Sequence, residues 1–278
     1  MKKRLCIGVA VCLVNFGAVQ TLAAQGYTWL GGKPVSESIE TRFAPPAGFT
    51  RVDAAKGSFA AWLRGLPLKQ GTPEVFLFSG KKKENQTAQA AVIEIDTGTR
   101  DLQQCADAVM RLRAEYLFAN GRQNDIHFKF TNGSDARYED WRKGGRPKIQ
   151  GAKAVWRQVA APDTGYKTFR KYLDVVFTYA GSASLEKELM PVKIEDVEIG
   201  DVFIQGGYPG HAVMVVDVAT EKISNKKMFL IAQSYMPAQD IHILKNPASQ
   251  NAWYSSEFTS DLETPEWTFR RTDSRRFK

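Results

Sequence analysis

Four short apolar segments near the C-terminus constrain the fold of this chain most strongly. Each is rich in Val, Ile, Leu, Met or Phe and is bounded by Gly, Pro or polar residues, which is the pattern of strands joined by turns. The second segment is apolar at five successive positions, 212–216, and this favours a buried strand. We therefore expect a meander of strands at residues 202–204, 212–218, 228–232 and 241–244.

The rest of the chain predicts helices and an N-terminal region rich in strands. Apolar residues between Leu102 and Phe118 recur every three or four positions, the spacing of one helix face. Residues 59–64 and 166–180 predict two further helices, and 75–78 with 90–95 predict a hairpin around a solvated loop. We expect a signal peptide at 1–24 and one α+β domain over 25–278, made of a β-rich entry region (25–99), a helix (100–119), an insert (120–196) and an antiparallel sheet with a tail (197–278).

The N-terminus has the features of an export signal. Lys2, Lys3 and Arg4 precede an apolar run over 5–18 and a small-residue exit at 21–24. The run is too short and too interrupted to span a membrane. We expect a periplasmic or secreted protein without stable membrane insertion.

The net charge and the sequence motifs indicate which classes of binding partner the protein can have. The net charge of +8 falls to +5 when the three basic residues of the signal are removed. Mild basicity suits an anionic envelope polymer such as peptidoglycan, and it equally suits a solvated basic tail at 270–278. Export and the lack of a zinc finger or an aromatic-basic motif argue against nucleic acid. His127 and His242 lie on predicted strands and are expected to be packed or outward-facing, and no metal motif or cofactor is expected.

Cys105 is the one cysteine that remains once Cys6 and Cys12 leave with the signal. A free, reactive thiol is one interpretation, because a helix N-terminus lowers the pKa of a thiol. The alternative is a buried cysteine that packs as a small hydrophobic side chain. In an acyl-transfer site, the Cys105 amide together with Gln103 or Gln104 could hold a developing oxyanion.

His211 follows Tyr208-Pro-Gly and begins the most apolar strand, so it is expected at the mouth of a cleft, unless it merely caps a turn. Asp217 lies six residues along the same strand, roughly 20 Å away, and is too far to orient the imidazole. If strands 212–218 and 228–234 pair, position 211 lies opposite about 235 and position 213 opposite about 233. Gln233 and Tyr235 would then flank His211, and a glutamine carbonyl could fix its tautomer.

Three segments carry a resemblance to a known family. They are Phe229-Leu-Ile-Ala-Gln-Ser-Tyr-Met-Pro-Ala-Gln239, the Gly-Asp-Val-Phe-Ile-Gln-Gly segment with Pro-Gly-His211-Ala, and Gln-Gln-Cys105-Ala-Asp-Ala-Val-Met-Arg-Leu-Arg-Ala-Glu-Tyr. Together they resemble the bacterial exported family called domain of unknown function 4846, over nearly the whole mature chain.

More distantly, residues 104–234 are similar to papain-like peptidoglycan hydrolases of the NlpC and CHAP types. The resemblance implies an α+β, papain-like core in which the helix of Cys105 packs on an antiparallel sheet. It also implies Cys105 as nucleophile, His211 as base and then acid, and Gln233 as the orienting residue. The Cys-to-His separation is longer than is usual in those groups, which an inserted segment would explain.

These features predict an exported cysteine hydrolase that cleaves peptide amides in cell-wall muropeptides. The first alternative is a non-catalytic envelope binding protein, and the second is a lipid thioesterase or transacylase. The candidates for lining a substrate groove are aromatic: Trp141, Tyr208, Trp253 and Tyr254. If the protein only binds a ligand, Trp156 is a further candidate.

Overall fold

A large antiparallel sheet forms the centre of the computed structural model, which describes residues 26–249 and 251–278. The expected signal peptide at 1–24 lies outside the described residues. Nine of the described strands belong to this sheet. Seven follow one another in the order β2 (Gln89–Val92), β11 (His242–Leu244), β10 (Lys227–Gln233), β9 (His211–Glu221), β8 (Val202–Gln205), β15 (Ser274–Arg276) and β7 (Met190–Pro191), while β1 (Phe49–Arg51) pairs with β9 and β12 (Tyr254–Ser255) pairs with β10.

The expected meander is confirmed, with its register. β9 and β10 are antiparallel, and Ala232 lies opposite Met214. Extending this register places position 233 opposite 213 and 235 opposite 211, as the sequence predicted. A β-bulge between Leu230 and Ile231 shifts the register farther along, towards the hairpin loop.

Both faces of the sheet are covered, which explains the unbroken apolar run of β9. Ala212 and Met214 point into the larger core, where α3 (Cys105–Ala119) and α2 (Phe59–Arg64) pack. Val213 and Val215 point into a second core on the opposite face. That core is closed by η3 (Ile194–Asp196), β12 and the hairpin of β13 (Asp261–Glu263) and β14 (Thr268–Arg270), and η4 (Arg271–Asp273) follows β14 directly.

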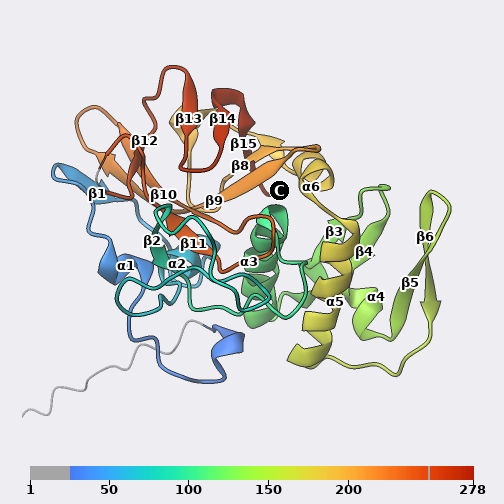
Figure 1. Ribbon diagram of the computed structural model, residues 1–278. Coiled ribbons are helices and arrows are strands. Elements are labelled where there is room, and N and C mark those ends of the chain that lie inside the picture. Colours follow the sequence, from blue (N-terminus) through green and yellow to red (C-terminus); the bar gives the residue numbers. More distant parts are fainter. Residues whose placement is uncertain (1–25, 250) are drawn as a thin grey trace, which may run out of the picture.

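The central helix α3 begins at Cys105, which confirms that the thiol lies in the first turn, although the helix starts later than the expected 100–119. Gln104 is its N-cap residue, and the backbone amide of Gln104 donates to Oδ2 of Asp107 at 3.1 Å. This contact satisfies one free N–H at the helix start. Because β9 is held in the sheet and α3 packs on it, the start of the helix is fixed beside the start of the strand (Figure 1).

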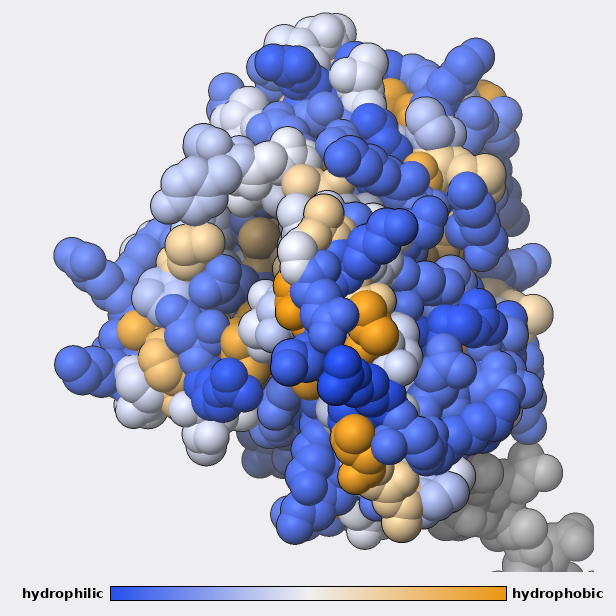
Figure 2. Space-filling view, turned by 90° about the vertical axis from the view of Figure 1, so that its right-hand side faces the viewer, coloured by the Kyte–Doolittle hydropathy of each residue, from blue (hydrophilic) through white to orange (hydrophobic). Residues whose placement is uncertain are grey.

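Most of the insert, residues 120–188, forms a layer next to α3, and its helix α5 (Tyr166–Tyr179) runs beside α3 in Figure 1. Phe118 of α3 stacks on Phe169 of α5 with ring centroids 4.4 Å apart. The outer face of this layer is mostly hydrophilic, with only scattered apolar side chains (Figure 2). Its elements are η2 (Gln123–Asp125), β3 (His127–Lys129), β4 (Asp135–Arg137), α4 (Tyr138–Arg142), β5 (Gly145–Gln150), β6 (Lys153–Gln158), α5 (Tyr166–Tyr179) and α6 (Ser182–Glu188).

The entry region differs from the expectation in one respect. Residues 75–78 do not form a strand paired with 90–95: Phe76 and Leu77 make only isolated bridges, to Lys82 and Gln239. The polar segment after them is largely exposed, as expected of a solvated loop, but Lys83 and Ala88 within it are buried. The other elements of this region are η1 (Thr28–Leu30), α1 (Ile39–Arg42), β1, α2 and β2.

No helix within residues 26–249 and 251–278 combines the length and the apolar character that crossing a membrane requires.

Candidate functional site

Cys105 and His211 line the same cavity, which has a volume of about 680 Å³. Three parts of the chain form its wall: the start of α3, the start of β9 with the loop before it, and the insert around α6. Residues beyond the end of β10 and Trp267 complete it. The lining residues are Gln104, Cys105, Ala106, Asp107, Thr131, Phe177, Ala180, Gly181, Ser182, Ala183, Gly207, Tyr208, Pro209, Gly210, His211, Tyr235, Met236 and Trp267.

The imidazole of His211 is oriented by Gln233, as the sequence predicted. Nε2 of His211 lies 2.9 Å from Oε1 of Gln233. Since an amide oxygen only accepts hydrogen bonds, Nε2 carries the proton and donates it. Nδ1 is then unprotonated in the neutral ring and is free to act as a base.

Aromatic side chains surround this imidazole. Ring centroids of Tyr235, Trp267 and Phe269 lie 4.7, 5.2 and 5.8 Å from that of His211. His211 is only 1% exposed. Burial lowers the pKa of His211 to about 4, although the hydrogen bond to Gln233 opposes the shift. The ring is therefore neutral near pH 7.

The thiol of Cys105 lies beside the first peptide of β9. The backbone amides of Ala106, Ala212 and Cys105 itself favour the thiolate. Burial and the nearby carboxyl of Asp107 outweigh them and raise the pKa of Cys105 to about 11. The predicted lowering of this pKa by the helix N-terminus is therefore wrong, because desolvation of the sulfur exceeds the effect of the amides.

The two glutamines before Cys105 have different positions. Gln104 lines the cavity, and its side-chain Nε2 donates to Oδ1 of Asp101 at 3.0 Å. Gln103 is buried elsewhere, with its side-chain oxygen accepting from Arg111. The structure does not bring Gln103 into the cavity, so the Cys105 amide and Gln104 remain as oxyanion candidates.

Most of the expected groove aromatics are core residues. Trp141, Trp253 and Tyr254 are each at most 5% exposed, and their polar atoms donate to the backbone carbonyls of Thr168, Ala44 and Lys245. The prediction that they line a groove is wrong, because their rings fill the interior between layers. Tyr208 does line the cavity and is 95% exposed at its rim. Trp156 lies on β6, outside the cavity of Cys105.

Asp217, His127 and His242 lie where the sequence places them. Asp217 lies outside the cavity and is held by Arg51 and Arg64. His127 is exposed, and His242 is fully buried on β11. Within the described residues, no group of three or more His, Cys, Asp or Glu side chains is arranged to hold a metal ion.

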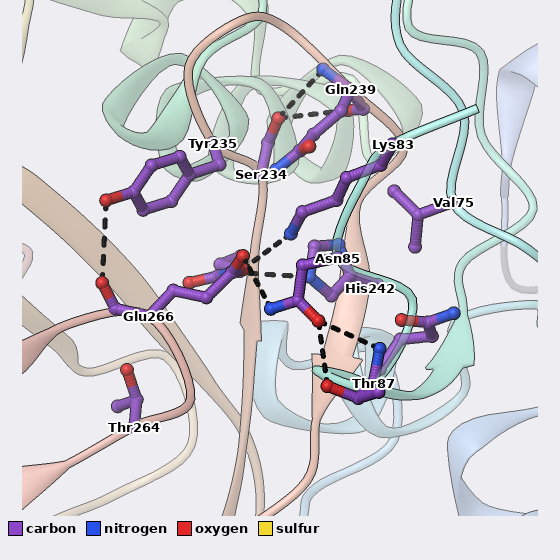
Figure 3. A network of polar contacts seen from close by, with 12 residues as sticks. Val75, Lys83, Asn85, Thr87, Ser234, Tyr235, Gln239, His242, Thr264 and Glu266 are labelled. Carbon is purple, nitrogen blue, oxygen red and sulfur yellow. Dashed lines mark hydrogen bonds and ion pairs between the residues drawn. The ribbon is translucent and has the colours of Figure 1, made fainter. Parts of the chain in front are cut away.

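Several residues near the site were missed by reasoning from the sequence. Behind Gln233, a buried network joins Lys83, Glu266 and His242 (Figure 3). Lys83 lies in a stretch whose polar composition is typical of a solvated loop. Glu266 lies in the turn between β13 and β14, next to Trp267. In the sequence, the one feature that could have pointed to this turn is Trp267, a large aromatic residue among polar neighbours.

Of the comparisons with known proteins, only the comparison with family models gives a match. No curated protein and no solved structure matches it. A family model does match, over residues 39–276, which include most of the entry region, the site and nearly all of the tail. The chain belongs to the family described as domain of unknown function (4846).

Proposed function

We propose that this protein is a cysteine hydrolase that cleaves an amide by acyl transfer through Cys105. The observation that carries the proposal is that His211 lines the cavity together with Cys105 and is hydrogen-bonded to the buried Gln233. A nucleophile, a base and a group that orients the base are the three parts of such a site. The order along the chain, with the thiol on a helix and the base on a strand, supports the papain-like interpretation of the core.

In this mechanism the thiol and the imidazole both start neutral. Nδ1 of His211 takes the proton of Cys105 as the sulfur bonds to the carbonyl carbon, and the carbonyl oxygen becomes an oxyanion. The Cys105 amide at the start of α3 is suited to hold that oxyanion. The proton then passes from His211 to the leaving amine as the carbon–nitrogen bond breaks, and water hydrolyses the thioester that remains.

The proposed substrate is a peptide amide of cell-wall muropeptides in the periplasm or outside the cell. Its support is the export signal read from the sequence and the mild positive charge, which suits an anionic polymer. The cavity supports it as well. Small residues of the insert, Gly181, Ser182 and Ala183, leave room for a peptide, and the ring of Tyr208 stands at the rim.

A second candidate function is non-catalytic binding of an envelope ligand in the same cavity. The observation in its favour is the raised pKa of Cys105, which keeps the thiol neutral and suits a packing role. A thioesterase or transacylase acting on lipid is a third candidate, because a thiol and an imidazole serve ester and thioester carbonyls equally well.

The test compares Cys105→Ser and His211→Ala with the wild type, and His127→Ala serves as a matched control on an exposed histidine. The substrates are purified sacculi and soluble muropeptides, and the readout is newly released amine. We expect turnover by the wild type and the control, loss in both site variants, and little change of thermal stability in Cys105→Ser, since the volumes are similar.

Three other results would change the assigned function. Binding of muropeptides without amine release, with affinity intact in Cys105→Ser, would establish the binding protein instead. Release of free thiol from an acyl thioester, with no action on amides, would establish the thioesterase. A strongly destabilised Cys105→Ser would indicate that the thiol serves packing.

A further inference from the structure

We propose that Glu266 and Lys83, together with His242, are positioning residues that fix the Gln233 side-chain amide and thereby place the proton of His211 on Nε2. The inference deepens the proposed function, on which its catalytic meaning rests. The contacts that carry it lie behind Gln233, on the side away from the Cys105 cavity.

The two hydrogens on Nε2 of Gln233 each face an acceptor. Oε2 of Glu266 lies 2.7 Å away, and Nε2 of His242 lies 3.3 Å away. A carboxylate oxygen can only accept, and the bond to it is charge-assisted. If the amide were turned over, its oxygen would face the carboxylate and lose that bond. The orientation with Oε1 towards His211 is therefore fixed from behind.

The tautomer of His242 makes it an acceptor. Its Nδ1 lies 2.9 Å from the backbone oxygen of Asp240, which can only accept, so Nδ1 carries the proton. Nε2 of the neutral ring is then a lone pair directed at Gln233. Burial lowers the pKa of His242 to about 4, so the ring is neutral near pH 7. The two histidines around Gln233 thus have opposite tautomers.

The carboxyl group of Glu266 is held in place by residues of the segment after 79. Lys83 Nζ lies 2.5 Å from Oε2 of Glu266, and Nδ2 of Asn85 donates to Oε1 at 3.1 Å. The side chains of Lys83 and Glu266 are only 9% and 12% exposed. The side-chain oxygen of Asn85 accepts hydrogen bonds from the backbone amide and the hydroxyl of Thr87. These bonds fix the amide NH₂ group of Asn85 towards Glu266 (Figure 3).

The consequence for the site is the availability of a base. With Oε1 of Gln233 facing His211, Nδ1 is unprotonated and can accept the proton of Cys105. With the amide reversed, its NH₂ group would face Nε2 and favour the other tautomer, in which Nδ1 is already protonated and no base is left for the thiol. Residues that never touch the substrate would in this way decide whether the thiol can be activated.

A first experiment uses the unmodified protein. The chain has three histidines, so ¹⁵N labelling of histidine and long-range ¹H–¹⁵N spectra at pH 7 resolve each ring. We expect His211 protonated on Nε2 and His242 protonated on Nδ1. The opposite tautomer at either ring would overturn the proposal, and this readout requires no substrate.

A second experiment replaces the buried pair by apolar side chains, in Lys83→Met with Glu266→Met. Replacing both charges avoids leaving one unpaired in the interior, so the fold is expected to persist. We expect the two nitrogen shifts of His211 to move towards each other as its tautomers mix, and turnover to fall about tenfold with KM little changed. Glu139→Met with Lys143→Met, on an exposed ion pair, is the matched control.

The outcomes separate this inference from the proposed function. An unchanged single tautomer of His211 in the folded double variant would overturn the positioning role, whatever the activity. A mixed tautomer in a protein that hydrolyses no amide would sustain the positioning role and remove the hydrolase.

Discussion

Nε of Arg64 lies 2.7 Å from Oδ1 of Asp217, and this ion pair joins α2 to the middle of β9 inside the protein. The other carboxylate oxygen, Oδ2, lies 2.7 Å from Nε of Arg51. Asp217 is completely buried, and Arg64 is 7% exposed. The carboxylate at the centre of the strand therefore serves the attachment of the entry region to the sheet and not the cavity.

Removal of this carboxylate is expected to destabilise the fold. In Asp217→Ala, Arg64 would keep its charge in the interior without a partner, which costs about 3–5 kcal/mol of unfolding free energy. Urea titration followed by tryptophan fluorescence measures the loss. Lys143→Ala, at an exposed ion pair, is the control and should change stability little. A cost below about 1 kcal/mol would contradict the structural role given to Asp217.

The reactivity of the thiol should be lower in the folded protein than in the unfolded chain. Burial raises the pKa of Cys105 to about 11 from a usual value of 9.0, so the thiolate fraction near pH 8 falls up to about a hundredfold. Iodoacetamide labelling at this pH, with and without urea, measures the ratio. Faster labelling in the folded state would instead mean that Cys105 and His211 form an ion pair.

Stability should depend on pH through the two buried histidines. Burial lowers the pKa of both His211 and His242 to about 4, below the 6.5 of an unperturbed histidine. As the pH falls from 6.5 towards 4, the unfolded chain takes up protons that the folded protein does not bind. The free energy of unfolding then falls, by about 1.4 kcal/mol per pH unit for each ring.

A histidine variant separates this contribution to the pH dependence of stability from the contributions of other titratable groups. Burial raises the pKa of Asp107, and this carboxyl works in the opposite direction. The comparison is therefore between the wild type and His242→Gln, in urea titrations at several pH values across the same window. The slope of the variant should be smaller by the contribution of one ring. Parallel curves would show that His242 is not held neutral.

Gly210 offers a test of how closely the strand start is fixed. A Cβ added there would lie 2.6 Å from the backbone oxygen of Gly207 and 2.8 Å from that of Gln205. Gly210→Ala must therefore shift the peptide before His211, at about 1–3 kcal/mol of stability, and should reduce any turnover. At Gly181, which also lines the cavity, an added Cβ meets nothing within 4 Å. Gly181→Ala should keep its thermal stability, and an equal loss in both variants would contradict the argument.

The sheet and the His211–Gln233 pair could be predicted because both depend on local pattern. Apolar runs bounded by turns fixed the strands, and pairing through a short loop fixed the register that sets position 211 opposite 235. The helix that carries Cys105 followed from periodicity, although the pattern extends to Leu102, which lies before the helix. In each case the determining residues are neighbours in sequence or in one hairpin.

The features that could not be predicted depend on contacts between segments that are distant in the sequence. Lys83 and Glu266 are 183 residues apart, and neither has a local pattern that reveals its partner. Trp141, Trp253 and Tyr254 resemble groove residues by type, but their burial is decided by the way the layers meet. The pKa of Cys105 was predicted in the wrong direction because the enclosure of the sulfur is a tertiary property.

The cavity wall supplied by residues 131 and 177–183 comes from a part of the chain that contributes neither the thiol, the imidazole nor the orienting amide. Cys105, His211 and Gln233 lie on α3, β9 and β10, whereas these wall residues lie in the insert. A substitution or a change of length in this wall therefore alters the shape of the cavity while the elements that hold the thiol, the imidazole and the amide keep their own packing.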